Sequence, residues 1–114
     1  MWFCSLYSGS SGNSLYVGTE KTNILIDAGL SGKKIVSSLN EIGISPKEIQ
    51  GLLVTHEHDD HVRGVGIISR MFNIPIYANT NTWESMEKSI GPVKSENIKI
   101  IESERCFCIG DVEI

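Results

Sequence analysis

Residues 55–61 read Thr-His-Glu-His-Asp-Asp-His, and this stretch says more about the fold and chemistry of the chain than any other. It contains all three histidines of the protein, with Asp60 directly before the last of them. Imidazole nitrogen and carboxylate oxygen are ligands of borderline divalent metals. The apolar run 52–54 precedes the stretch and a helical pattern follows it, which predicts a strand-to-helix corner. Side chains two and four residues apart can converge at such a corner, so the sequence predicts a metal site.

The alternative for any single histidine is an ordinary surface or half-buried side chain without a special role. The interleaving with acids argues against that alternative for this cluster. Without a metal ion, the corner would hold three uncompensated carboxylates close together, those of Glu57, Asp59 and Asp60. Metal binding is therefore the favoured interpretation of the whole stretch.

The spacing His-x-His-x-Asp-His at residues 56–61 resembles the signature motif of the metallo-β-lactamase-fold hydrolases. Two further segments resemble the YycJ-like (WalJ-like) bacterial exonuclease branch of that superfamily. They are Phe-Cys-Ser-Leu-Tyr-Ser-Gly-Ser-Ser-Gly-Asn-Ser at residues 3–14 and Ile-Leu-Ile-Asp-Ala-Gly-Leu at residues 24–30. The metal motif is highly specific for the superfamily, and the serine-glycine opening is moderately specific for the branch. The resemblance extends over essentially the whole chain.

This resemblance implies a role for each polar residue of the motif. His56 and His58 would bind a first metal ion, and Asp60 and His61 a second. Asp60 would also be the catalytic residue that positions the attacking hydroxide. Asp27, at the end of a predicted strand, matches the acid that lies behind the metal ions and orients a histidine. An aspartate that merely opens a turn before the following Ala-Gly pair is the alternative for Asp27.

The resemblance also implies a cofactor and a function. Two divalent metal ions, zinc first and manganese or iron as alternatives, would hold a hydroxide that attacks a phosphodiester. The expected enzyme is a metal-dependent phosphodiesterase or DNA exonuclease, and its partner would be nucleic acid with a single-stranded DNA end. A hydrolase of a thioester, lactam or lactone is one alternative, because a fold does not fix a function. A catalytically incomplete fragment that binds metal weakly is another.

The order of the predicted elements indicates the fold class. Strands come first and are followed by strand-helix alternation, which fits an α/β (α+β) sheet packed by helices on one side, the N-terminal half of an αββα sandwich. Predicted strands cover residues 3–7, 14–18, 23–27, 51–55, 75–78 and parts of 98–114. Predicted helices run from a Ser31 cap to a Gly43 stop, over a short turn at 45–48, over 62–72, and from Thr80 or Asn81 to Lys88.

Residues 1–114 are expected to be the N-terminal portion of a single metallo-β-lactamase-fold domain. The family supplies further histidine and aspartate ligands downstream of this motif, and no histidine follows His61 here. Residues 106–114 predict a strand, a Gly-Asp turn and a second strand that has barely begun, which would leave an open sheet edge. We therefore expect the second half of the domain to be absent from this chain.

Composition sets broad limits. The apolar fraction of 40% and the charged fraction of 21% are ordinary for a globular domain. An odd count of three cysteines without a secretory leader favours a cytoplasmic location. No apolar run approaches the roughly twenty residues that span a membrane, so no membrane partner is expected. The net charge of −4 argues against a broad basic face for nucleic acid, although two divalent ions would reverse the sign locally. The sequence does not indicate an oligomeric state.

A serine- and glycine-rich loop at residues 8–13 is the possible substrate loop. Its backbone amides and polar side chains could contact an anionic substrate, and a plain turn is the alternative. The residues concerned are Ser8, Ser10, Ser11 and Asn13.

Two other pairs favour the ordinary interpretation. Lys33 and Lys34 fall in the first turn of a predicted helix, where cations oppose the helix dipole by about 0.3–1 kcal/mol each. Solvated surface lysines are favoured over phosphate ligands. Cys106 and Cys108 alternate along one predicted strand and are interpreted as small hydrophobic residues of a half-buried strand, not as metal ligands.

Overall fold

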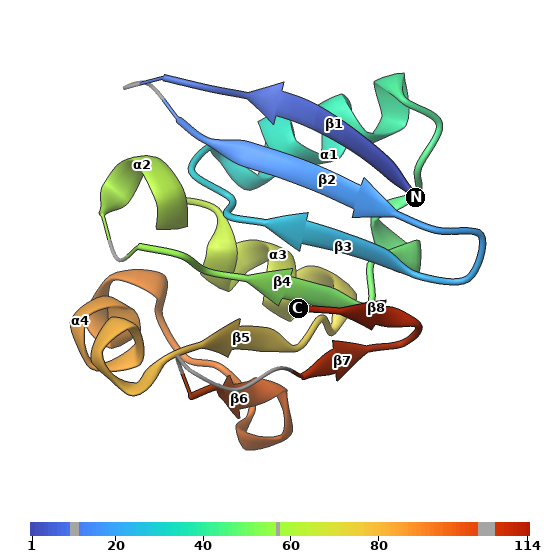
Figure 1. The fold of residues 1–114 in the computed structure, drawn as a ribbon. Coiled ribbons are helices and arrows are strands. Elements are labelled where there is room, and N and C mark those ends of the chain that lie inside the picture. The colour runs from blue at the N-terminus through green and yellow to red at the C-terminus, as the bar shows by residue number, and fades with distance from the viewer. Residues whose placement is uncertain (10–11, 57, 103–106) are drawn as a thin grey trace.

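The computed structural model describes residues 1–9, 12–56, 58–102 and 107–114, with the backbone but not the side chains of residues 59 and 60. Within these ranges, one sheet of six strands has the order β1-β2-β3-β4-β5-β6 (Figure 1). β2 is antiparallel to both of its neighbours, β1 and β3, and β3 through β6 are parallel. The bounds are β1 (Trp2–Tyr7), β2 (Ser14–Gly18), β3 (Asn23–Ile26), β4 (Gly51–Leu53), β5 (Ile76–Ala78) and β6 (Ile98–Ile100).

Helical connections join the parallel strands, as parallel pairing requires. The connection from β3 to β4 contains α1 (Gly32–Glu41) and a 3-10 turn (Pro46–Glu48). The connection from β4 to β5 contains α2 (Asp59–Val62) and α3 (Val65–Phe72). The connection from β5 to β6 contains α4 (Thr80–Ile90) and a second 3-10 turn (Ser95–Asn97). Figure 1 shows α1 and α3 behind the sheet, and a short hairpin of β7 (Cys108–Ile109) and β8 (Val112–Glu113) in front of it.

The two faces of the sheet are covered differently. Leu25, Leu52 and Ile76 lie side by side on β3, β4 and β5 and are completely buried in the core that includes the helices. Burial of each such side chain contributes about 1.5–3 kcal/mol. On the other face, Ile24 packs against Ile109 and Val112 of the hairpin. The predicted fold class, an α/β sheet with its helices on one side, is confirmed.

Side-chain caps explain several element boundaries. Ser31 caps α1 by accepting a hydrogen bond from the Lys34 amide at 3.3 Å, as predicted. The last helix begins at Thr80, one of the two predicted starts. Asn79 caps it, because the Asn79 Oδ1 atom accepts from the Thr82 amide at 2.8 Å, and α4 continues past the predicted end at Lys88 to Ile90.

The prediction of one helix over residues 62–72 was also wrong, because the helix is interrupted at Gly64. The Gly64 amide donates to the carbonyl of Ala28 at 2.6 Å. A Cβ atom at Gly64 would lie 2.3 Å from the carbonyl oxygen of Leu30, which is too close for any side chain. The break between α2 and α3 therefore lets the backbone of the helical connection approach the segment that follows β3.

Substitution of Gly64 by alanine is expected to lower the free energy of unfolding by about 1–3 kcal/mol, the usual cost of forcing extra volume into a packed site. Urea denaturation of the whole protein measures this loss. Ser37→Ala, on the exposed surface of α1, is the matched control and should stay near the wild type. Equal stabilities for the two variants would contradict the close approach at Gly64.

The β7–β8 hairpin is attached to the loop between β2 and β3 through Asp111. The Thr19 hydroxyl donates to the Asp111 carboxylate at 2.8 Å, and the Asp111 amide donates to the Thr22 hydroxyl oxygen at 3.2 Å. Hydrogen bonding with Thr22, and then with Thr19, lowers the pKa of the Asp111 carboxyl. The ionised carboxylate is thus the form that holds the hairpin in place.

This lowered pKa predicts an acid-dependent contribution to stability. A carboxyl whose folded pKa lies below its unfolded value of about 3.9 contributes stability that is present above that value and is lost as the pH falls through the folded pKa. The difference in unfolding free energy between the wild type and Asp111→Asn should therefore shrink between pH 5 and pH 2. A difference that stays constant over this range would contradict the attachment.

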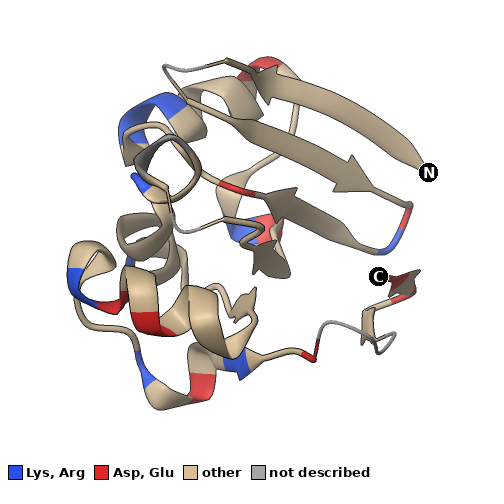
Figure 2. Ribbon diagram, turned by 60° about the vertical axis from the view of Figure 1, so that its left-hand side comes forward, with Lys and Arg blue, Asp and Glu red and all other residues tan. Residues whose placement is uncertain are grey.

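Charged residues are distributed along the chain. Figure 2 shows both basic and acidic residues on several elements of the described ribbon. Lys33 and Lys34 are exposed, in agreement with their interpretation as solvated surface lysines.

The interpretation of Cys108 as a packed hydrophobic residue was wrong, because its side chain is exposed. The neighbouring Ile109 is the residue of β7 that points into the core. Cys106 lies outside the described residues. In the part of the chain described, no helix combines the length and the apolar character needed to cross a bilayer.

Candidate metal centre

The candidate site lies where β3 and β4 end. Asp27 follows β3, and residues 55–58 follow β4. Because these strands are parallel neighbours, their carboxyl ends meet at the same edge of the sheet, where ligands of α/β folds bind. Two backbone hydrogen bonds join the segments, from the Asp27 amide to the Leu53 carbonyl at 2.7 Å and from the Ala28 amide to the His61 carbonyl at 2.9 Å.

Asp27 is buried and adopts a left-handed backbone conformation, with φ of 62°. Such a conformation is uncommon outside glycine, and aspartate is among the residues that tolerate it. The Asp27 carboxylate accepts hydrogen bonds from the Thr55 amide at 2.8 Å and the Thr55 hydroxyl at 2.6 Å. Its Oδ2 atom also lies 2.7 Å from Nδ1 of His61. These contacts are those of an acid that orients a histidine, and they go beyond what a residue that opens a turn would make.

The three imidazoles lie close together at the corner. The ring centroid of His56 is 4.8 Å from that of His61 and 6.1 Å from that of His58. Two imidazoles on one tetrahedral zinc ion have ring centroids roughly 5 Å apart, because each Zn–N bond is about 2.0–2.1 Å. The His61 amide donates to the His58 carbonyl at 2.8 Å, so α2 begins directly after His58. The donor chemistry of these rings fits a divalent metal ion, and the pair with the spacing of two rings on one ion is His56 and His61.

The described side chains do not make up a complete set of metal ligands. Asp60 is a residue of α2, and the structure describes its backbone but not its side chain. Among the side chains that are described, no group of three or more histidine, cysteine, aspartate or glutamate residues is arranged to hold a metal ion. A structural or catalytic zinc site needs at least three protein ligands. Ligands beyond these imidazoles are therefore needed for a complete site.

The possible substrate loop is attached to the same edge of the sheet. The Asn13 side chain donates to the Gly9 carbonyl at 2.9 Å and accepts from the Gly9 amide at 3.2 Å, which closes the loop. The Asn13 carbonyl accepts from the Gly29 amide at 2.9 Å, and the Ser14 hydroxyl donates to the Asp27 carbonyl at 2.8 Å. Ser8 is exposed, and Ser10 and Ser11 lie outside the described residues.

Thr55 is a site residue to which the sequence reasoning assigned no role. Its amide and hydroxyl both bind Asp27, and its hydroxyl oxygen also lies 3.0 Å from Nδ1 of His56. The only signal in the sequence is the position of this threonine, directly between the apolar strand and the first histidine. Its contact with Asp27 spans 28 positions of the chain, so the local sequence does not reveal it.

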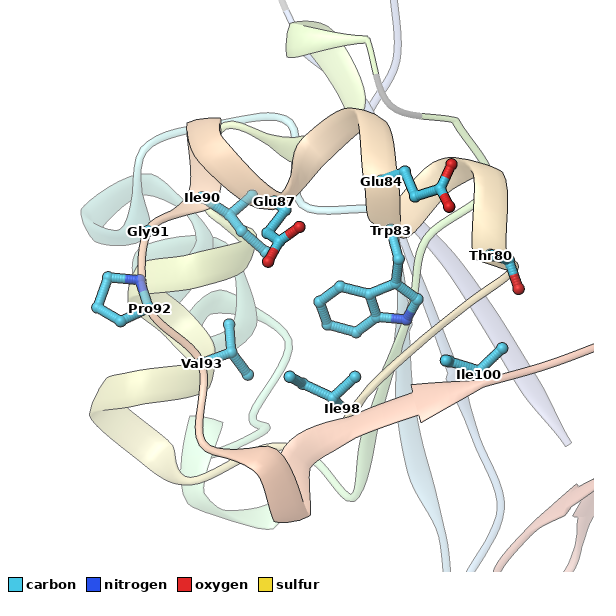
Figure 3. Close-up of a pocket in the computed structure, with 10 residues that line it drawn as sticks. All are labelled: Thr80, Trp83, Glu84, Glu87, Ile90, Gly91, Pro92, Val93, Ile98 and Ile100. Carbon is cyan, nitrogen blue, oxygen red and sulfur yellow. The ribbon is translucent and has the colours of Figure 1, made fainter.

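A separate groove of about 570 Å³ lies between α4 and β6 (Figure 3). Trp83, Ile98 and Ile100 form its apolar lining, and Glu84 and Glu87 lie along its side. The described lining residues include no imidazole or thiol. The three imidazoles lie instead at the β3–β4 edge.

The chain belongs to the metallo-beta-lactamase superfamily, whose family model matches residues 7–112. Among its relatives, exodeoxyribonuclease WalJ of Streptococcus pneumoniae is 48% identical over 111 residues, which cover 96% of this chain and 41% of that protein. Exodeoxyribonuclease YycJ of Bacillus anthracis is 41% identical over 112 residues, 98% of this chain and 42% of that protein. The chain thus spans less than half the length of these curated relatives. The predicted resemblance to the superfamily and to its YycJ-like branch is confirmed.

Solved structures show the same fold. A B3 metallo-beta-lactamase with an active-site glutamic acid superimposes with a TM-score of 0.79 at 20% sequence identity. The matched region covers 97% of this chain and 47% of that chain. At this identity the likeness establishes the fold of residues 1–114 and says nothing about the substrate.

Proposed function

We propose that residues 1–114 form the N-terminal portion of one metallo-β-lactamase domain and that the whole protein is a metal-dependent exodeoxyribonuclease. The observation that carries this proposal is the gathering of three imidazoles beside a buried, fully hydrogen-bonded carboxylate at the β3–β4 edge. Membership in the superfamily and the names of the two relatives described above support the reaction class.

The proposed ligands are those of the sequence motif. His56 and His58 would hold one divalent ion, and Asp60 and His61 a second, with the remaining ligands supplied from outside residues 1–114. Zinc suits imidazole ligands best, and manganese or iron are the alternatives because carboxylate ligands share the site. Residues 1–114 would give each ion two ligands, and a zinc site needs at least three. This agrees with the lack of a three-ligand cluster among the described side chains.

When bound, two divalent ions supply Lewis-acid activation of water and neutralise charge on a phosphodiester. The residues of this chain would hold the ions and orient the groups around them. Asp27 orients the ring of His61 through its Nδ1 atom. Asp60 would direct the attacking water towards the phosphorus atom, as the family motif implies. His56 and His58 are exposed in residues 1–114, which leaves their rings accessible to further ligands and to a substrate.

Nucleic acid is the proposed substrate, in the form of a single-stranded DNA end. Because the net charge of the chain is −4, recognition of phosphate would depend on the metal ions and on the loop that holds Ser8 and Asn13. A cytoplasmic location is proposed with it, because Cys4 and Cys108 are free thiols, which persist in a reducing compartment.

The test presents the whole protein with two kinds of substrate. Single-stranded DNA labelled at either end, and a panel of thioesters, lactams and lactones, are incubated with the zinc- or manganese-loaded protein. Stepwise shortening of the DNA from one end, with no turnover of the panel, is the expected result. Hydrolysis of a panel member without loss of DNA would overturn the nuclease assignment and support a carbonyl substrate instead.

A further inference from the structure

A short chain of hydrogen bonds connects Asp27 to the first histidine of the motif through Thr55. The Thr55 hydroxyl oxygen lies 2.6 Å from Oδ2 of Asp27 and 3.0 Å from Nδ1 of His56. The Thr55 amide donates to Oδ1 of the same carboxylate at 2.8 Å, so the threonine is held at two points. The position of its hydroxyl group is therefore set by the buried acid.

The direction of each bond follows from counting protons. A threonine hydroxyl has one hydrogen to donate, and an ionised carboxylate can only accept. The 2.6 Å contact between the two oxygens requires that hydrogen to lie between them, since two acceptors would otherwise repel each other. The Thr55 oxygen must then act as the acceptor towards His56. Nδ1 of His56 is accordingly the nitrogen that carries the hydrogen.

We propose that Thr55 is a positioning residue that extends the orienting effect of Asp27 to His56. One buried carboxylate then fixes the tautomers of two imidazoles, that of His61 directly and that of His56 through the Thr55 hydroxyl. In both rings Nδ1 donates, and Nε2 is the nitrogen with the lone pair that a metal ion needs. This inference rests on the proposed metal site, because a tautomer matters only if the ring is a ligand.

Because His56 is exposed, its tautomer depends on the hydrogen bond to Thr55. A neutral histidine side chain in water favours the tautomer with the hydrogen on Nε2, which cannot bind a metal ion through that atom. His56 and Thr55 are both exposed, so burial does not impose the opposite tautomer on the ring. The hydrogen bond from Nδ1 to Thr55 supplies that preference before any metal ion arrives.

Nitrogen NMR of the whole protein, labelled with ¹⁵N-histidine and freed of metal, reads the tautomer directly. The measurement is made near pH 8.5, about two units above the usual histidine pKa of ~6.5, so that the rings are neutral. Thr55→Val removes the hydroxyl at nearly constant shape, and Thr55→Ser keeps it. Circular dichroism and the spectra of His61 confirm that each variant is folded.

The expected result is a protonated Nδ1 at His56 in the wild type and in Thr55→Ser, and a shift towards protonated Nε2 in Thr55→Val. Zinc affinity should fall roughly 10–100-fold in Thr55→Val only, as for other outer hydrogen-bond partners of metal ligands. A His56 ring with its hydrogen on Nε2 in the wild type would overturn the inference, as would an unchanged ring in folded Thr55→Val. Either of these outcomes with tight zinc binding would leave the proposed function intact. The expected tautomers without zinc binding would overturn the proposed function alone.

Discussion

Replacement of His58 by alanine in the whole protein is expected to abolish hydrolysis of DNA while leaving the fold intact. His58 is exposed in residues 1–114, so removal of its ring creates no cavity there. The unfolding free energy, compared between the metal-free proteins, should therefore stay within about 0.5 kcal/mol of the wild type. The ring is one of the proposed direct ligands. Its loss should therefore cost more than the roughly 10–100-fold that removal of an outer partner costs. Initial rates on end-labelled single-stranded DNA measure the effect.

A matched control keeps this result specific. Glu41→Gln changes an exposed side chain at the last residue of α1, a helix behind the sheet, and should retain the activity of the wild type. If His58→Ala retained activity as well, the assignment of the metal centre to this corner would be wrong.

Substitution of Asp27 by asparagine is expected to have the second-largest effect, although it changes few atoms. Asparagine tolerates the left-handed conformation that residue 27 adopts, so the backbone should be preserved. Its amide group, however, would place a donor where the carboxylate now accepts from Thr55 and His61. A donor facing Nδ1 of His61 favours the tautomer with the hydrogen on Nε2, which blocks metal binding there.

The expected outcome for Asp27→Asn is a roughly 10–100-fold loss of metal affinity with a folded protein, measured by titration calorimetry with zinc. Asp27→Ala should in addition lose stability, because a buried donor left without its acceptor costs about 1–3 kcal/mol. Unchanged zinc affinity in Asp27→Asn would show that the carboxylate does not orient a ligand.

Much of the fold could be predicted from short stretches of sequence, because their signals are local. Ser31 caps a helix through a contact three residues away, and the alternation of residues 14–18 and 23–26 reflects a hairpin of neighbouring strands. The fully apolar β4 is buried on both faces, as its sequence indicates. These elements depend on interactions within a few residues, which the sequence displays directly.

The features that escaped prediction depend on distant contacts. Gly64 interrupts a helical pattern because its backbone approaches Ala28 and Leu30, which lie more than 30 positions earlier. Nothing in the sequence around Gly64 reveals that approach. Cys108 follows the expected alternation of β7, but which face of so short a strand points inward is set by packing against Ile24.

The candidate site also contains residues that the local sequence reveals and contacts that depend on distant parts of the chain. The cluster of histidines is visible because the three residues lie within one short stretch, and family resemblance assigns Asp27 to them. The structure adds the bonds that join these residues across the sheet edge, from Asp27 to His61 and to Thr55. Thr55 could not be assigned from the sequence, because a threonine between a strand and a loop is ordinary until its partners are known.

The proposed function and the tautomer inference both depend on the binding of divalent metal ions by imidazoles at this corner. Elemental analysis of the whole protein, purified without added metal and compared with His58→Ala, tests it most directly. The expected result is close to two divalent transition-metal ions per chain in the wild type and a clear loss of metal in the variant. A wild-type protein that holds no such ion, and that acts on DNA equally well after treatment with a chelator, would contradict the claim.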